Sequence, residues 1–352
     1  MNSLLPYMQK VGVGKTGSKQ LDRAEADQAM TALLEGQYHP VTFGAFFMGM
    51  RYKGESPEEL AGFLDAMNRT LEHPSKPPPE GLLNCAGAYD GKERTCNVGI
   101  PAALVTAAAG VPIALHGARQ VPTKFGMTTS HVLEALGVCT LRSLDGVNDD
   151  LHSIGIGYVE QSAFHAGLHA LLAFRGQVGK RTILNTMEAL SNPFGAASHL
   201  GGFFHDAYAE LVCRTVQSNC TQFKRVVLVK GIEGSDELRP GAMFIAKLID
   251  NEYQTERVDS DLLSLPVHIS ELSAPTDSLE QRTEISAERI LKLLDEPEAE
   301  SAFKNSVIMN AAIRIYAAGR TGSVAEGIGL ATDALKSGGA KRIFDIWRTR
   351  RP

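Results

Sequence analysis

The chain has 352 residues, of which 43% are hydrophobic and 21% charged, and its formal net charge is -5 at neutral pH. This composition is that of a globular protein rather than a disordered chain, and the length predicts one large domain with a smaller one. The net charge gives no support to nucleic-acid binding by the surface as a whole. Five cysteines without a CxxC pair, and no basic-then-apolar leader after Met1, predict a reducing, cytoplasmic setting.

Residues 1–75 show helical patterns and no strand signals. Apolar residues at helical spacing follow Asp22, and Ser56 with Pro57 is typical of a helix start. Residues 41–50 (VTFGAFFMGM) are apolar on nearly every face. This pattern predicts a helix buried within a bundle or in a dimer interface.

A proline-rich segment, residues 74–79 (PSKPPP), cannot sustain a helix and predicts a stiff linker. We therefore expect a small helical domain over residues 1–78 and a large α/β domain over residues 79–352. A helical segment near residues 170–200 is expected to join the small domain.

After the linker the pattern changes to strand, glycine-containing loop, helix and strand. Residues 82–86 and 111–115 are short apolar runs, separated by a loop at 87–94 and an alanine-rich helix at 100–109. This is a βαβ unit, so a parallel sheet is predicted, and residues 225–229 add a later strand.

The longest uncharged run, residues 96–118, could be mistaken for a membrane span. It is rich in alanine and glycine and contains Pro101 and Pro112. A buried helix followed by a buried strand explains it better, so no membrane partner is expected.

Basic residues gather in the loops that follow the first two predicted strands. Lys92 and Arg94 lie in the first loop, and Arg119 and Lys124 follow the second strand. The carboxyl ends of parallel strands meet at one edge of a sheet, and helix N-termini there favour anions. An anion site is therefore favoured over ordinary solvated turns.

Asp236 and Glu237 follow the predicted strand at residues 225–229. Adjacent carboxylates at a strand end suit Mg²⁺ held beside substrate phosphates, although such pairs are also common in plain turns.

Two other patterns resemble a nucleotide-binding loop and a metal site but lack a residue that each would need. Gly14-Lys15-Thr16 resembles the end of a nucleotide-binding loop, but Gln9 stands where that loop needs a glycine. His165 and His169 have the spacing of metal ligands on a helix, yet no acidic third ligand is near, so a surface pair is expected. No nucleophile–base set is found.

Several segments, in this order, resemble those of the anthranilate phosphoribosyltransferases of glycosyltransferase family 3. The likeness runs from about Asp22 to Ile346. The segments are YKGESPEELAGFLDAM from Tyr52, NVGIPAALVTAAAGVPIALHGAR from Asn97, RGQVGKRTILNTMEALSNP from Arg175, VKGIEGSDEL from Val229 and NAAIRIYAAG from Asn310.

The resemblance implies a small all-helical domain plus a large α/β domain with a central, mainly parallel sheet, as in the nucleoside phosphorylase/phosphoribosyltransferase class, with the active cleft at the hinge. It implies transfer of a phosphoribosyl group from phosphoribosyl pyrophosphate, with magnesium, to a small amine or aromatic acceptor. It also implies a homodimer formed through the amino-terminal helices.

The resemblance assigns site residues by position and no catalytic nucleophile. The donor or another phosphorylated ligand would be bound by Gly87, Asp90, Lys92, Arg94, Asn97 and Lys124. The acceptor would be bound by His116, Arg119, His165 and Arg175, of which Arg175 would face the acceptor's carboxylate. Asp236 and Glu237 would bind the metal.

The chain departs from the family pattern at two phosphate-binding positions. Residues 86–90 read AGAYD where the family has GTGGD, and residues 97–100 read NVGI where the family has Asn-x-Ser-Thr. Two glycines that allow close phosphate approach, and two hydroxyl groups, are thereby replaced. An altered donor or acceptor is therefore one interpretation.

The other interpretation is a non-catalytic paralogue that binds single-stranded nucleic acid along a basic groove. The side chains expected to contact phosphates are Lys92, Arg94, Arg119, Lys124, Lys180, Arg181, Arg348, Arg350 and Arg351. A pyrimidine nucleoside phosphorylase would share the fold, but its Gly-Gly-Thr-x-Asp segment is absent around residues 126–132.

Overall fold

The computed structural model describes residues 2–14, 16–218, 221–259 and 265–352. Lys15 of the Gly14-Lys15-Thr16 pattern and Cys220, one of the five cysteines, lie outside the described residues. Within the described ranges, no helix is both long enough and apolar enough to cross a membrane.

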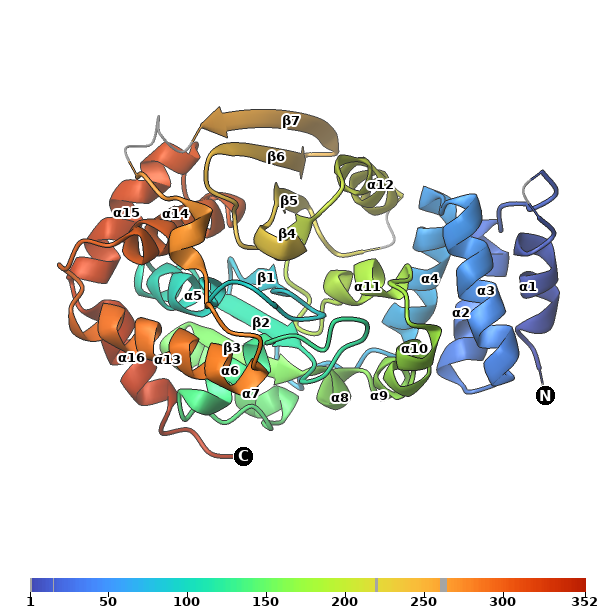
Figure 1. Cartoon of the computed structure of the whole chain (residues 1–352), viewed down its shortest axis with the longest axis horizontal. Coiled ribbons are helices and arrows are strands. Elements are labelled where there is room, and N and C mark those ends of the chain that lie inside the picture. The colour runs from blue at the N-terminus through green and yellow to red at the C-terminus, as the bar shows by residue number, and fades with distance from the viewer. Residues whose placement is uncertain (1, 15, 219–220, 260–264) are drawn as a thin grey trace.

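The amino-terminal part is a bundle of helices at one end of the molecule (Figure 1). Its members are α1 (Leu5–Val11), α2 (Arg23–Leu34), α3 (Pro40–Lys53) and α4 (Pro57–Arg69). The predicted starts are confirmed, because Asp22 and Ser56 each form a capping box with the glutamate three residues later. Helices α2 and α4 approach closely at Gly62, where a Cβ would lie 2.2 Å from the Arg23 carbonyl oxygen.

Helix α3 buries one face and exposes the other. Phe43, Phe46 and Phe47 are buried in the bundle. On the opposite face, Val41 is 73% and Tyr52 is 78% exposed. Within one chain, therefore, only part of the apolar surface of residues 41–50 is buried.

A seven-stranded sheet forms the centre of the large part of the chain. Its strands are β1 (Leu83–Cys85), β2 (Ile113–Gly117), β3 (Ile156–Glu160), β4 (Ser198–Phe203), β5 (Arg225–Lys230), β6 (Ala242–Ile249) and β7 (Glu252–Asp259). The order is β3-β2-β1-β4-β5-β6-β7, with β1 to β5 parallel and the last two strands antiparallel. The predicted α/β class with a mainly parallel sheet is confirmed.

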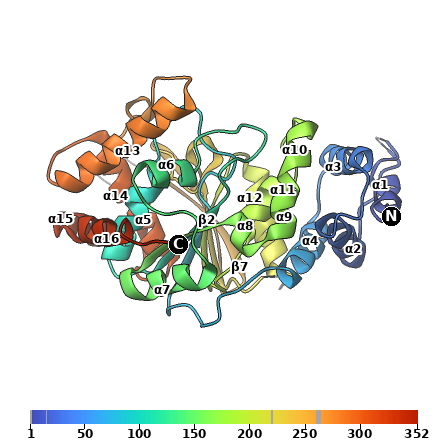
Figure 2. The ribbon, with the colours of Figure 1, turned by 90° about the horizontal axis from the view of Figure 1, so that it is seen from below.

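Helices on the side remote from the bundle complete one large core (Figures 1 and 2). They include α5 (Gly99–Ala108), α6 (Thr129–Ala135), α13 (Leu279–Asp295), α14 (Ala302–Ala317), α15 (Val324–Lys336) and α16 (Gly339–Trp347), while α7 (Leu144–Ile154) packs beside β3. Helix α5 is buried along almost its whole length against α14 and α16. Residues 96–118 thus form the buried helix and strand that their composition predicts.

Short helices connect the bundle to the sheet. They are α8 (Gln161–Phe164), α9 (Ala166–Ala170), α10 (Leu172–Val178) and α11 (Leu184–Met187), with α12 (Asp206–Gln217) following β4. Apolar residues of the bundle, of α9 to α12 and of β4 to β6 form one continuous core. The bundle is therefore held against the sheet by apolar packing as well as by the chain at residues 70–82.

The chain reverses its direction of travel across the sheet between β1 and β4. From β1 it proceeds outward to β2 and β3, and from β4 it proceeds the other way to β5. The loops after β1 and β4 consequently diverge at the carboxyl edge of the sheet. Open α/β sheets bind their ligands in such a crevice.

Candidate functional site

A cavity of about 420 Å³ lies at this crevice, between the bundle and the carboxyl ends of β1, β4 and β5. The bundle contributes α3, and the remaining wall comes from the loops after β1 and β4 and from α11 and α12. The residues that line the cavity include Arg51, Gly87, Asp90, Arg181 and Asn185, with an aromatic wall of Phe203, Phe204 and Tyr208.

The loop after β1 is fastened to the segment that precedes α11. The carboxylate of Asp90 is buried and lies 2.6 Å from the guanidinium of Arg181 and 3.9 Å from Nζ of Lys124. Arg51 of α3 donates a hydrogen bond of 2.8 Å to the carbonyl of Arg181. Three parts of the chain therefore meet through charged groups at the cavity wall.

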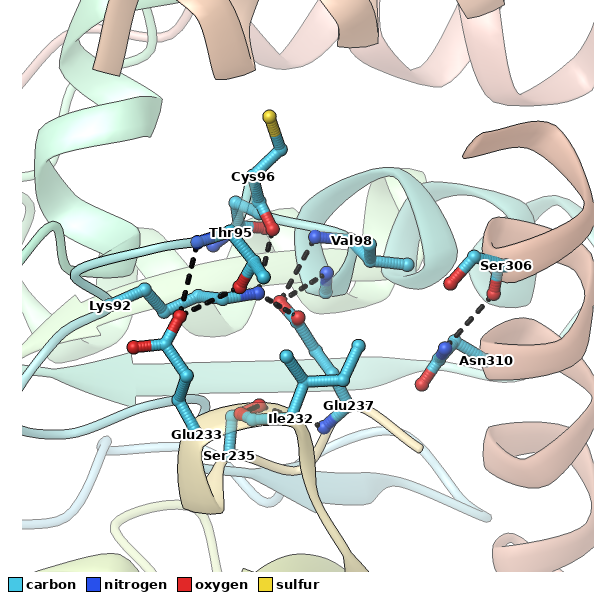
Figure 3. A network of polar contacts seen from close by, with 12 residues as sticks. Lys92, Thr95, Cys96, Val98, Ile232, Glu233, Ser235, Glu237, Ser306 and Asn310 are labelled. Atoms are coloured by element: carbon cyan, nitrogen blue, oxygen red, sulfur yellow. Dashed lines mark hydrogen bonds and ion pairs between the residues drawn. The ribbon is translucent and has the colours of Figure 1, made fainter. Parts of the chain in front are cut away.

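The same loop folds its backbone around the carboxylate of Glu233 (Figure 3). This carboxylate accepts hydrogen bonds from the N–H groups of residues 93, 94 and 95, at 2.9, 3.2 and 3.1 Å, and from Oγ1 of Thr95 at 2.8 Å. Lys124 lies 3.9 Å away. Burial alone would raise the pKa of Glu233, but the hydrogen bonds and nearby lysines lower it below its ordinary value.

The acidic pair that follows β5 is buried and neutralised by cations of the same chain. Glu237 Oε2 contacts Nζ of Lys92, and Glu237 Oε1 accepts the N–H groups of Val98 at 3.0 Å and Gly99 at 2.9 Å. Lys92 Nζ also donates to the Cys96 carbonyl at 2.6 Å. These groups lie together at the N-terminus of α5 (Figure 3).

The second member of the pair, Asp236, contacts a different cation. Its Oδ2 accepts a hydrogen bond of 2.9 Å from the fully buried guanidinium of Arg314 on α14. Burial raises the pKa of Asp236, and Arg314 opposes this shift. Both carboxylates of the pair therefore already have a positive partner.

This arrangement does not fit magnesium at the acidic pair. Mg²⁺ needs near-octahedral oxygen ligation, and both oxygens of Glu237 are committed to Lys92 and the backbone. Of the oxygens of the pair, only Oδ1 of Asp236 lacks a hydrogen-bond partner within the described part of the chain. No cluster of three or more His, Cys, Asp or Glu side chains suited to a metal occurs among the described residues.

The remaining residues of the expected donor set are separated. Gly87 and Asp90 line the cavity, whereas Lys92 and Asn97 are buried outside it. The Asn97 side chain accepts a hydrogen bond of 2.8 Å from the N–H of Ile100, in the first turn of α5. The side chain of Arg94 is exposed. Lys124 stands behind the loop, between Asp90 and Glu233.

None of the four residues of the expected acceptor set lines the cavity, and each is engaged elsewhere. Arg175 forms a bidentate pair with Glu188, with N–O distances of 2.6 and 2.9 Å, and both are buried. Arg119 contacts the carboxylate of Glu134. His165 is buried and accepts the N–H of Leu168 at 3.2 Å, which differs from the expected surface position.

His116 lies in a buried polar cluster between the strands. Its Nε2 is 3.3 Å from Nδ2 of Asn84, which also lies 3.1 Å from Nδ1 of His199. Burial, with a contribution from the neighbouring His199, lowers the pKa of His116 to about 3, and burial lowers the pKa of His199 to about 4. Both rings are neutral at physiological pH.

Sequence reasoning missed Glu188, Glu233 and Arg314. Glu233 lies in the segment VKGIEGSDEL, which resembles the family. Its backbone φ of 56° is rare for a residue other than glycine. No local pattern pairs Arg314 with Asp236 across 78 positions of the chain. Such pairs emerge only when α14 is placed beside the sheet.

Comparison with known proteins agrees with this architecture. Residues 5–70 match the helical bundle domain of the glycosyl transferase family, and residues 87–341 match its a/b domain. The anthranilate phosphoribosyltransferase of Methanosarcina acetivorans is 30% identical over 349 residues, covering 99% of this chain and 90% of that protein. That of Methylobacterium nodulans is 30% identical over 346 residues, covering 98% of each chain.

Solved structures give the same result. Anthranilate phosphoribosyltransferase from Thermus thermophilus superposes with a TM-score of 0.82 at 26% identity, covering 99% of each chain. The Saccharomyces cerevisiae enzyme, solved in complex with PRPP and Mg, has a TM-score of 0.82 at 17% identity and covers 98% of this chain and 97% of its own. The second likeness establishes the fold alone.

The buried neutral histidines predict a pH dependence of stability. His116 stays neutral in the folded chain, whereas an unfolded chain binds a proton there below about pH 6.5, so its contribution to stability falls as the pH drops from 7 towards 4. We expect His116→Gln to reduce the slope of unfolding free energy against pH by up to about 1.4 kcal/mol per pH unit in this window.

The measurement is urea unfolding at a series of pH values. His152→Gln, which changes an exposed histidine of α7, serves as the matched control and should leave the slope as in the parent protein. An unchanged slope in His116→Gln would contradict the neutral buried state.

Proposed function

Because the chain belongs to the glycosyl transferase family, we propose that it binds a phosphorylated ribosyl donor in the cavity between the bundle and the sheet and transfers the phosphoribosyl group to a small amine or aromatic acceptor. The observation that carries the proposal is the cavity of about 420 Å³ at the point where the chain reverses across the sheet. The proposed hinge joins the helical domain, residues 1–78, to residues 79–352.

The cavity wall supplies two kinds of contact that such a pair of ligands needs. Phe203, Phe204 and Tyr208 provide apolar and aromatic surface for a planar acceptor. Arg51 and Arg181 contribute guanidinium groups to the wall next to the loop after β1, where Arg181 is paired with Asp90. Apolar walls with a few placed polar groups are typical of small-molecule sites.

In the proposed reaction, no side chain of the protein forms a covalent bond to the substrates. The acceptor nitrogen forms a bond to C1 of the ribose while the bond from C1 to the pyrophosphate oxygen breaks, and the pyrophosphate leaves with the electron pair. The nitrogen then loses its proton to water or to the released pyrophosphate. Positioning and stabilisation of the departing charge are the main requirements. Arg51 and Arg181 meet them in this proposal.

Magnesium has no assigned step here, although the related yeast enzyme was solved with PRPP and Mg. Lys92 and Arg314 already neutralise the acidic pair. The proposal therefore places the donor against the cavity guanidinium groups. It does not require anthranilate to be the acceptor.

The test is calorimetric titration with phosphoribosyl pyrophosphate, with and without magnesium. We expect binding that Arg181→Gln weakens at least tenfold, because a hydrogen bond to a charged group contributes about 1.5–3 kcal/mol. Lys180→Gln is the matched control, since Lys180 is adjacent and exposed but does not line the cavity. No binding up to millimolar donor would contradict the proposed transferase function.

Single-stranded nucleic acid is the second candidate ligand, and exposed cations around the cavity favour it. Arg51, which lines the cavity, and Arg94 and Lys180, which do not, have exposed side chains. Fewer of the predicted phosphate-contacting side chains are free than the sequence suggests, because Lys92 is buried and Arg350 pairs with Asp150 on α7. If the donor fails to bind, an oligonucleotide whose affinity falls steeply with salt would establish this alternative.

We further propose that two copies of the chain associate through the exposed apolar face of α3, which carries Val41, Met48 and Tyr52. Met48→Glu should convert the dimer to a monomer in sedimentation velocity at micromolar concentration. Leu141→Glu is the matched control, because Leu141 is 71% exposed but lies in the other part of the chain. A parent protein that sediments as a monomer would contradict the proposal.

A further inference from the structure

We propose that His199 forms a polar subsite on the sheet side of the cavity and selects an uncharged, planar aromatic acceptor that carries a hydrogen-bonding group. Aromatic amines with a carboxamide belong to this class, and aromatic carboxylates do not. The inference rests on the proposed function for the assignment of this cavity to the acceptor, and it adds the chemical class of that acceptor.

The sheet side of the cavity, called the floor below, is formed by adjacent strands. Its residues are Ala86 next to β1, His199 and Gly201 on β4, and Leu228 on β5. All four are buried, and His199 is 1% exposed. Residues 199 and 201 alternate along β4 and therefore share one face of the sheet. The floor is thus apolar except for the imidazole of His199.

Two contacts fix the orientation of this imidazole. The ring stacks on Phe223, with the ring centroids 4.7 Å apart and an interplanar angle of 27°. Nδ1 of His199 lies 3.1 Å from Nδ2 of Asn84 on the neighbouring strand. Asn84 Nδ2 also donates to the carbonyl of Ser191 at 3.1 Å, so the amide is itself held in place. The imidazole is therefore oriented before a ligand binds.

The other ring nitrogen, Nε2, is left for a ligand. It has no hydrogen-bond partner among the described residues. A Cβ at Gly201 would lie 2.8 Å from Nε2 and 2.9 Å from Cδ2 of Leu228. Because Gly201 has no side chain and lines the cavity, Nε2 can be reached from the cavity. A buried polar atom without a partner costs free energy, so a ligand group that pairs with Nε2 gains affinity.

The floor does not suit a negatively charged group. Burial lowers the pKa of His199 to about 4, so the ring carries no positive charge at physiological pH. Arg51 is exposed and Arg181 is half-buried, and neither belongs to the floor. Arg175 is paired with Glu188 and does not line the cavity. A carboxylate on the floor would be a buried charge without a cation, which costs far more than a buried amide that is hydrogen-bonded.

The test is calorimetric titration of the protein, without a donor, with three small aromatic amines. The amines 2-aminobenzamide and 2-aminobenzoate have nearly the same shape but differ in charge, and aniline lacks the third group altogether. We expect 2-aminobenzamide to bind at least tenfold more tightly than 2-aminobenzoate and at least fivefold more tightly than aniline. A carboxamide can donate to Nε2 or accept from it, so it fits either tautomer of the ring.

Two variants examine the role of Nε2. His199→Phe keeps a ring that can stack on Phe223 but removes the nitrogen. It should weaken the binding of 2-aminobenzamide at least fivefold and that of aniline less than twofold. Gly201→Ala leaves the contact between Asn84 and His199 in place and puts a methyl group against Nε2. It should cause the same selective loss, and it serves as the test if His199→Phe does not fold.

The matched control is His205→Phe. His205 also lines the cavity, but its side chain is exposed and it lies at the start of α12. The same chemical change at this position should alter the affinity for 2-aminobenzamide less than twofold. An equal loss in His205→Phe and His199→Phe would place the ligand away from the floor and would overturn the inference.

The inference is also overturned if the parent protein binds 2-aminobenzoate as tightly as 2-aminobenzamide, or binds none of the three amines. Retention of the parent affinity for 2-aminobenzamide in the folded variants at His199 and Gly201 would overturn it as well. These outcomes are distinct from failure of the transferase proposal, because that proposal fails when the parent does not bind phosphoribosyl pyrophosphate. Donor binding without any selectivity at His199 would leave the transferase proposal in place and remove this inference alone.

Discussion

The contact between Glu237 and Lys92 at the N-terminus of α5 is the constraint on which the site depends. It joins the loop after β1, the start of α5 and the turn after β5 in one buried cluster. Removing either partner would leave a buried charge uncompensated, which typically costs about 3–5 kcal/mol. This buried cluster fixes the loop, whose residues Gly87 and Asp90 line the cavity.

Other buried pairs of a cation and a carboxylate lie in the same part of the chain. Arg314 is paired with Asp236, and Arg175 is paired in bidentate fashion with Glu188. Glu233 fills a backbone concavity in the loop after β1. Family resemblance would assign Asp236 to a metal and Arg175 to an acceptor carboxylate. In this chain, internal ion pairs occupy these positions, and for this reason the proposed function assigns ligand recognition to Arg51, Arg181 and the aromatic wall of the cavity.

The fold could be predicted from sequence because its signals are local and agree with one another. The caps at Asp22 and Ser56, the linker at residues 74–79 and the buried run at 96–118 each specify an element directly. The state of the site could not be predicted in this way. Whether Lys92 faces a ligand or Glu237 depends on a contact 145 positions away along the chain, and neither residue type distinguishes the two cases. The altered sequence at residues 86–90 indicated a changed phosphate loop. It did not indicate that carboxylates of the same chain, Glu233 and Glu237, accept the N–H groups of the residues that follow.

The most direct measurement is a crystal structure obtained with Mn²⁺ and pyrophosphate, with anomalous scattering used to locate the metal. We expect Glu237 to remain on Lys92 and on the N–H groups of Val98 and Gly99, Glu233 to remain in its loop, and no manganese peak at Asp236 and Glu237. A manganese ion bound by these two carboxylates, with Lys92 displaced, would contradict the internal closure of the site.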